Sequence, residues 1–304
     1  MLLLIDAGNT RIKWALATDA SNDHAPDIGR PDDAGQPVGK RDRARIIAAD
    51  AGRWIASGAV LHDAVESLAG AWGKAPVNAV VIANVAGATV RAALLRQLEF
   101  LQLRRRAASD SAQDAAPLVH WFASAAQVAG VRNGYRAPER LGCDRLAALI
   151  GARALLPDQA VIVAVCGTAT TVDALTASGD FIGGMILPGP GLMASSLARH
   201  TAQLPAIVAM TAGPGQAAQS ITCLTPFCDN TDDAIASGCL AAQAGAIERA
   251  VAAHGGAHCL LSGGAAYLVA PRLGVAVTSV DNLVLIGLQV VASAVTQRAQ
   301  VEPK

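Results

Sequence analysis

The feature that most restricts the fold of this chain is a short pattern that occurs once in each half. Residues 5–16 read IDAGNTRIKWAL and residues 164–175 read AVCGTATTVDAL, so that Gly167 falls under Gly8 and the final leucines coincide. Each stretch is a buried-looking apolar run, a glycine turn with threonine or asparagine, and a run that alternates apolar and polar residues. Such runs are typical of two successive strands. We therefore predict a duplicated supersecondary unit, one per half of the chain.

Strands and helices are expected to alternate along the rest of the chain, as in an α/β fold. Residues 78–87 and 181–191 are expected to be strand followed by turn, and the stretch 258–269 is expected to be strand, glycine turn and helix. Expected helices cover residues 46–72, 88–98, 143–156, 192–204, 231–255 and 281–295. In the 231–255 helix, Thr231 or Asp232 is expected at the N-cap and Gly255 beyond the end. Residues 19–45 and 117–140 are expected to be irregular.

Composition and charge exclude several classes of protein. The 304 residues carry 24 basic and 24 acidic side chains, and a net charge of zero argues against nucleic acid or an anionic membrane as the main partner. Asp6 interrupts the first apolar run, which argues against a signal peptide. No apolar run approaches the roughly 18 residues of a membrane span. The six cysteines form no CxxC pair, and we expect reduced thiols in a cytoplasmic protein.

The first glycine turn carries the residue types that bind phosphate. Successive backbone N–H groups in a turn of Gly8, Asn9 and Thr10 can form a concave site for an anion. Asp6 can hold Mg²⁺ through water, and the metal then bridges phosphate oxygens, while Lys13 supplies positive charge. A Walker motif is absent, and the turn leads into a strand, which excludes a Rossmann fingerprint. The pattern therefore favours a metal-phosphate site of another kind.

Two glycine turns in duplicated halves, with a third at LSGGA near the C-terminus, resemble the actin, hexokinase and Hsp70 superfamily. Within it, the whole chain resembles the type III pantothenate kinases, also called the Bvg accessory factor-like family. The matching stretches are DAGNTRIK, GCDR at 142–145, GTATTVD, GGMILPG and TAQLP. The resemblance implies an α/β fold of two RNase H-like (actin-like ATPase) domains, 1–140 and 141–304, with mixed sheets flanked by helices. The nucleotide would lie in the cleft between them.

The resemblance also implies a reaction and a set of site residues. The reaction is the ATP-dependent phosphorylation of pantothenate to 4'-phosphopantothenate, the first step of coenzyme A biosynthesis. Asp144 would accept the proton of the pantothenate hydroxyl, Asp6 would orient Mg²⁺, and Arg145 is a candidate contact for the pantothenate carboxylate. A homodimer is expected on the same grounds. The residues expected to bind ATP are Asp6, Ala7, Gly8, Asn9, Thr10, Arg11, Ile12, Lys13 and Thr168. Those expected around pantothenate are Tyr135, Gly142, Cys143, Asp144, Arg145 and Thr201.

Simpler roles for three of these residues stay open. Asp144 can be an acid that stabilises a helix N-terminus, Tyr135 can close a loop, and Thr201 can be a capping hydroxyl. One position departs from the family pattern, because Val165 stands where many members have an acid that helps to bind a monovalent cation, K⁺ or NH₄⁺.

Two other functions compete with the kinase. Another small-molecule kinase of the superfamily is disfavoured by GCDR and TAQLP. A non-enzymatic accessory or regulatory protein on the same fold would be favoured if Asp6, Asp144 or the glycine turns were lost, and all are retained.

Overall fold

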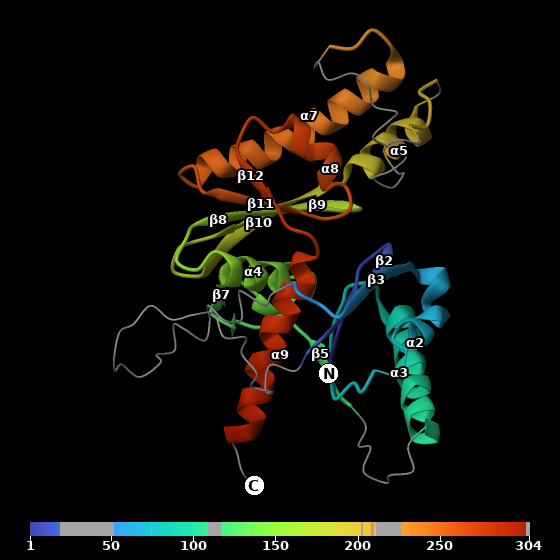
Figure 1. Cartoon of the computed structure of the whole chain (residues 1–304). Coiled ribbons are helices and arrows are strands. Elements are labelled where there is room, and N and C mark those ends of the chain that lie inside the picture. The colour runs from blue at the N-terminus through green and yellow to red at the C-terminus, as the bar shows by residue number, and fades with distance from the viewer. Residues whose placement is uncertain are drawn as a thin grey trace, which may run out of the picture. The chain divides into compact units, whose positions relative to one another are not determined.

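The structure is a computed structural model of the chain, shown in Figure 1, and the chain divides into two compact units. The first unit comprises residues 1–124, 142–155 and 284–304, and the second comprises 125–141 and 156–283. The described residues are 1–18, 52–73, 75–108, 117–201, 203–207, 210 and 227–301. The expected loop at 19–45 and the beginning of the expected 46–72 helix lie outside them.

The units are not the two contiguous halves that a boundary between residues 140 and 141 would produce. The chain enters the second unit at residue 125, returns to the first for 142–155, and returns again at 284. Helix α4 (Cys143–Leu155) contacts β4 (Ala79–Asn84) of the first unit, which explains why it belongs there. A periodic pattern predicts that a helix forms but does not specify which sheet it covers.

The first unit is built on a five-stranded mixed sheet in the order β3–β2–β1–β4–β5. Strand β1 pairs antiparallel with β2 and parallel with β4, and β4 pairs parallel with β5. In β1, Leu3 and Ile5 are fully buried in one core, and Leu4 is fully buried on the opposite face. The other strands are β2 (Arg11–Ala17), β3 (Ala56–Leu61) and β5 (Leu118–Phe122), and β1 is Leu2–Ala7.

Helices cover this sheet. The core that holds Leu3 also contains Leu68 and Leu94, from α2 and α3. Glycine at 287 lets α9 approach α4 closely, because a Cβ there would lie 1.8 Å from the carbonyl oxygen of Ala147. The helices of this unit are η1 (His62–Ser67), α2 (Leu68–Ala71), α3 (Ala88–Ala108), α4 and α9 (Leu283–Val301).

The second unit is built on a seven-stranded mixed sheet in the order β12–β11–β8–β9–β10–β7–β6. Helix α7 (Thr231–Ala253) packs on β8 and β9, and α5 (Pro190–His200) packs on α7, as can be followed in Figure 1. The strands are β6 (Gln127–Val128), β7 (Val131–Asn133), β8 (Val161–Cys166), β9 (Ala169–Leu175), β10 (Asp180–Pro188), β11 (His258–Ser262) and β12 (Val277–Ser279). The shorter helices are η2 (Pro138–Arg140), α8 (Ala266–Val269) and η4 (Ala270–Arg272).

The duplicated unit predicted from the sequence is present in both sheets. The hairpin β1–β2 and the hairpin β8–β9 are both antiparallel, and the first strand of each also pairs parallel with a later strand, β4 or β11. The two first strands have the same sequence of buried and half-buried residues, in which Val165 corresponds to Asp6. The expected α/β class, with two mixed sheets flanked by helices, is therefore confirmed.

Several local expectations were wrong. Residues 56–61, expected to be helical, form strand β3 because they pair with β2, and the expected irregular stretch 117–140 contains β5, β6 and β7 because β4 and β10 pair with it. The N-cap of α7 is Asn230, whose side chain accepts from the N–H of Asp233. In β3, β5 and β7 the local secondary-structure propensity is overridden by pairing with strands that are distant in sequence.

The cysteines also depart from expectation at one place. Cys143, Cys166, Cys239 and Cys259 are free thiols, as expected, but Cys228 is disulfide-bonded. The expectation of six reduced thiols is therefore corrected at Cys228. It was wrong there because spacing along the chain does not reveal which thiols the fold brings together. Cys223 lies outside the described residues. In the described ranges no helix is both long and apolar enough to cross a membrane.

Candidate functional site

The first glycine turn joins β1 to β2 and is closed by its own backbone. The N–H of Gly8 donates to the carbonyl oxygen of Arg11 at 3.1 Å. Asn9, Thr10 and Arg11 are exposed, whereas Ala7 and Ile12 are fully buried. The turn therefore presents polar side chains and backbone to solvent, and Ala7 and Ile12 can face a ligand only through their main chain.

Asp6 lies at the end of β1, half-buried, and its cross-strand neighbour in the β1–β2 register is Lys13. Burial raises the pKa of Asp6 to about 7; the charge of Lys13 acts in the opposite direction, and the charge of Asp144 raises it further. A buried carboxylate that is costly to ionise without a cation nearby is strongly stabilised in its charged form when a cation binds to it. Asp6 is therefore the residue of this turn best suited to a metal ion.

Asp144 is held in the first turn of α4 by its own neighbours. The N–H of Arg145 donates to Oδ1 of Asp144 at 2.8 Å. Glycine at 142 makes room for this carboxylate, because a Cβ there would lie 2.7 Å from Oδ1. Burial raises the pKa of Asp144, while the N–H and the charge of Arg145 lower it. The carboxylate is thus fixed in position and is a stronger proton acceptor than an exposed aspartate.

Cys143 lies close enough to both acids and to Asn84, at the end of β4, for each to influence its thiol. Burial raises the pKa of its thiol, and the charge of Asp144 raises it further, while a backbone contact with Asn84 acts in the opposite direction. The thiol is therefore protonated at neutral pH and is a poor nucleophile. The ends of β1 and β4 and the N-terminus of α4 thus converge on a small acidic site within the first unit.

The donor set fits a magnesium ion that is shared with a phosphate ligand. Among the described residues, no group of three or more His, Cys, Asp or Glu could enclose a metal by itself. Mg²⁺ bound through one or two carboxylates, with water and substrate phosphates completing its shell, does not need such a group. Asp6, with Asp144 close enough to influence its ionisation, meets this requirement.

The second glycine turn joins β8 to β9 and is packed against the start of α5. The N–H of Gly167 donates to the oxygen of Ala169 at 3.0 Å, and the N–H of Gly189 donates to the oxygen of Thr168 at 2.8 Å. Only glycine fits at 189, because a Cβ would lie 2.0 Å from the oxygen of Gly167. Gln243 of α7 fixes this junction by donating to the oxygen of Pro188 at 2.8 Å. The exposed Thr168 is thus carried on a well-anchored turn.

The third glycine turn lies directly against the second. Gly263 has φ +98°, and a Cβ there would lie 2.2 Å from the carbonyl oxygen of Cys166. The N–H of Ala265 donates to the same oxygen at 2.9 Å. The structure therefore brings two of the three glycine turns together in the second unit, and the first lies in the other unit.

Tyr135 and Thr201 belong to the second unit, whereas Gly142–Arg145 belong to the first. The ring of Tyr135 lies 5.3 Å from that of Phe181, between centroids. The hydroxyl of Thr201 donates to the oxygen of Leu197 at 2.7 Å, at the end of α5. The capping role that the sequence left open for Thr201 is thus present, and its neighbour Ala202 lies outside the described residues.

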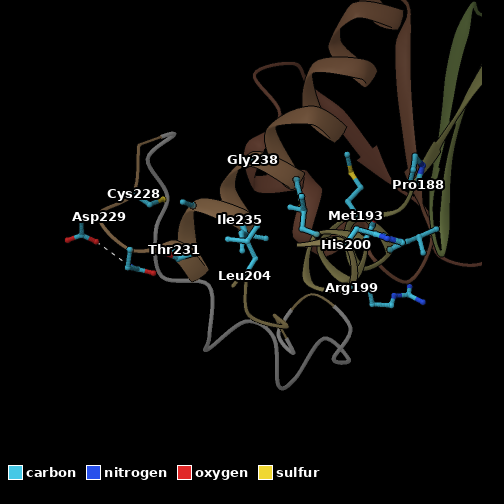
Figure 2. A pocket seen from close by; sticks show the side chains of 16 residues that line it. Pro188, Met193, Arg199, His200, Leu204, Cys228, Asp229, Thr231, Ile235 and Gly238 are labelled. Atoms are coloured by element: carbon cyan, nitrogen blue, oxygen red, sulfur yellow. Dashed lines mark hydrogen bonds between the residues drawn. The ribbon is translucent and has the colours of Figure 1, made fainter. Parts of the chain in front are cut away.

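A pocket of about 1190 Å³ lies between α5 and α7, as Figure 2 shows. Its lining is largely apolar and includes Met193, Leu204 and Ile235, with Arg199 and His200 as its basic members. The pocket belongs wholly to the second unit and contains none of the acids described above.

Comparison with known proteins decides the family. A family model described as type III pantothenate kinase matches residues 2–253. The chain belongs to the type III pantothenate kinase family. A type III pantothenate kinase from Janthinobacterium sp. (strain Marseille) is 48% identical over 96% of this chain and 97% of its own length. A type III pantothenate kinase from Herminiimonas arsenicoxydans is 47% identical with the same coverage.

A solved structure also supports the fold of this type III pantothenate kinase family member. A Baf family protein from Campylobacter jejuni superposes with a TM-score of 0.51 over 98% of this chain and 100% of its own, at 14% identity. Since the identity is low, this likeness concerns the fold alone.

Sequence reasoning missed two residues that contact the first turn or the acids. His62, at the start of η1, has Nε2 2.8 Å from the carbonyl oxygen of Gly8. Asn84 ends β4, which is parallel to β1, and its backbone lies beside the thiol of Cys143. The end of the predicted 78–87 strand was a usable signal for Asn84, but no pattern in the sequence connects His62 with a turn 54 residues away.

Proposed function

We propose that this kinase uses the Asp6 turn to hold the phosphates of ATP and uses Asp144 to accept the proton of the pantothenate hydroxyl. As a member of its family, the chain is an ATP-dependent pantothenate kinase of coenzyme A biosynthesis. The observation that carries the proposal is the proximity of the two acids: α4, which carries Asp144 in its first turn, contacts β4, and β4 is the parallel neighbour of β1, where Asp6 lies. The charge of Asp144 accordingly raises the pKa of Asp6 at the glycine turn. Transfer of a phosphoryl group needs a metal-phosphate site and an oriented hydroxyl next to each other.

The proposed roles follow from where each group lies. Asp6 would hold Mg²⁺ through water, and the ion would supply positive charge to the transferring phosphoryl group. The N–H groups of the exposed turn 8–11 and the ammonium group of Lys13 would orient the phosphates. The exposed hydroxyl of Thr168 is proposed to contribute a further phosphate contact.

Pantothenate is proposed to contact Tyr135, Arg145 and Thr201, and the main chain of residues 142–143. Asp144, on the first turn of α4, would bind the primary hydroxyl and remove its proton late in the reaction. Arg145 is buried, with 7% of the residue exposed, and its guanidinium would attract the carboxylate of the substrate.

An ADP-release assay tests the proposed substrate. We expect ADP formation with pantothenate and Mg·ATP, and rates near background when glucose or another sugar replaces pantothenate. Pantetheine, which lacks the carboxylate, should show whether that group is recognised. Turnover with a sugar but not with pantothenate would favour another small-molecule kinase, and no turnover with any acceptor would favour an accessory protein.

Val165 leads to a prediction about monovalent cations. This residue is the structural counterpart of Asp6 in the second hairpin, and it has no carboxylate to offer a cation. We expect activity to depend little on K⁺ or NH₄⁺, or any bound ion to be held by carbonyl oxygens. Titration of KCl and NH₄Cl into a Na⁺- and K⁺-free Tris buffer at constant ionic strength measures this. A strong requirement together with a carboxylate ligand on the bound ion would contradict the prediction.

We also propose that the kinase is a homodimer that acts in the cytoplasm. Apolar side chains are exposed on β10 and α5, namely Ile182, Ile186, Leu192 and Leu197. Contiguous exposed apolar surface is typical of protein–protein contacts, and we propose that these side chains contribute to one.

A further inference from the structure

We infer that His62 is a positioning residue that orients the phosphate turn, an inference that rests on the proposed role of that turn. Its Nε2 lies 2.8 Å from the carbonyl oxygen of Gly8. The contact arises because β3 pairs with β2, which places Leu61 opposite Arg11 and brings the start of η1 beside the β1–β2 turn. His62 is half-buried and begins η1, whose residue Val65 packs in the core.

The chemistry of this contact determines which nitrogen of the imidazole ring carries a hydrogen. A carbonyl oxygen can only accept, so Nε2 of His62 must carry the hydrogen and donate it to Gly8. Both the neutral ring in this tautomer and the imidazolium can make the bond. The ring therefore acts as a fixed donor to the main chain.

The bond controls the direction of a second main-chain group. No cis peptide bond occurs in the described residues, and in a trans peptide the C=O and the following N–H point in opposite directions. Fixing the oxygen of Gly8 thus fixes the N–H of Asn9, which points away from His62. In a phosphate turn, N–H groups of this kind are the donors that must be aimed before the ligand arrives.

The turn needs such an anchor because its glycine is not locked by packing. A Cβ at position 8 would meet only the oxygen of Arg11, at 3.4 Å, so the surroundings would tolerate other conformations. Glycine also loses more conformational freedom on ordering than any other residue. Two hydrogen bonds oppose this freedom, namely Gly8 N–H to Arg11 and His62 to the oxygen of Gly8.

The test compares two variants of His62 with a control in the full-length enzyme. We expect His62→Ala to raise the KM for Mg·ATP about three- to tenfold, the range that corresponds to the net contribution of one hydrogen bond. The KM for pantothenate should change by less than about twofold, since the bond does not orient Asp144. His62→Gln retains an N–H donor and should recover most of the loss. His120→Ala, at a half-buried histidine on β5 of the same unit, should match the wild type.

Titration calorimetry with Mg·ADP as the probe, together with thermal melts, separates positioning from general stability. Weaker Mg·ADP binding by His62→Ala, recovered by His62→Gln, supports the inference. Unchanged Mg·ADP affinity in a folded His62→Ala protein overturns it. Equal losses for both substrates in both variants, in parallel with a lower Tm, also overturn it. If His62→Ala does not fold, the His62→Gln variant carries the test. We then expect folded His62→Gln to bind Mg·ADP nearly as well as the wild type, and clearly weaker binding overturns the inference.

The Asp6→Asn variant distinguishes this inference from the function on which it rests. An inactive Asp6→Asn enzyme with wild-type behaviour of both His62 variants refutes only the role of His62. An active Asp6→Asn enzyme with unchanged Mg·ATP binding refutes the phosphate turn itself.

Discussion

Asp6→Asn is expected to abolish turnover at saturating Mg·ATP. The amide keeps the shape of the side chain but loses the negative charge that would hold Mg²⁺ beside the glycine turn. Because the metal supplies several kcal/mol of charge stabilisation in phosphoryl transfer, we expect a loss of at least about 10³-fold in kcat. Steady-state ADP release measures it, with Lys13→Gln as a partner variant that removes the neighbouring positive charge and should be impaired less. Near wild-type rates for Asp6→Asn would exclude the proposed metal-phosphate site.

The melting temperature of the same variant tests whether the loss of turnover is caused by unfolding. The pKa of Asp6 is raised from 3.8 to about 7 by burial, so between these values the unfolded chain loses the proton and the folded protein keeps it. The contribution of this group to the free energy of unfolding therefore falls as the pH rises through this window. Above about pH 7 the folded protein carries the full free-energy cost of burying the charged carboxylate. In the metal-free protein, Asp6→Asn should have a higher Tm than the wild type at pH 8. The difference should shrink as the pH is lowered toward 5.

Asp144→Asn is expected to lower kcat by about 10²- to 10⁴-fold, the usual contribution of a positioned base. The amide can still accept the N–H of Arg145 that holds Oδ1 at 2.8 Å, so the first turn of α4 should stay in place. What it loses is the capacity to accept the proton of the pantothenate hydroxyl. Burial raises the pKa of the wild-type carboxyl, so the rate of the wild-type enzyme should fall at acidic pH as Asp144 becomes protonated.

Substrate binding separates this role from that of a helix-capping acid. Mg·ADP affinity should be nearly unchanged in Asp144→Asn, and the KM for pantothenate should change less than kcat because the proposed contacts through Tyr135 and Arg145 remain. The part of the acidic limb that comes from Asp144 should be lost in the variant, whereas protonation of Asp6 should still lower the rate. Turnover within about threefold of wild type, or under ~1 kcal/mol of barrier, would assign Asp144 a purely structural role.

Much of the site's local structure could be predicted from short stretches of the sequence. Apart from Asp6, the runs 2–7 and 161–166 are apolar because both faces of these strands are buried, and the glycine turns follow them directly. Asp144 could be placed in the first turn of a helix because the Ala- and Leu-rich run after it has helical composition. These features depend on neighbours within a few residues, which is why they can be recognised without the fold.

Other features could not be predicted because they depend on pairing between distant segments. Residues 56–61 have no strong strand pattern, yet they form β3 by pairing with β2, and this pairing is what carries His62 to the oxygen of Gly8. In the same way, the stretch 118–122 becomes a strand because β4 offers it a parallel edge. The free energy of such pairings comes from burying both partners together, and neither partner shows it alone.

The sequence by itself determined the duplicated strand pairs, the position of Asp6 before a glycine turn, the helix that begins with Asp144, and the absence of an acid at Val165. Only the tertiary structure decided that the chain returns to the first unit at residues 142–155, where α4 contacts β4 and Asp144 influences the ionisation of Asp6. The physical reason is that periodicity reports how much of a segment is buried, whereas the partner that buries it is chosen by packing. At Gly287 that packing is direct, because the missing side chain lets α9 reach the backbone of α4 at Ala147.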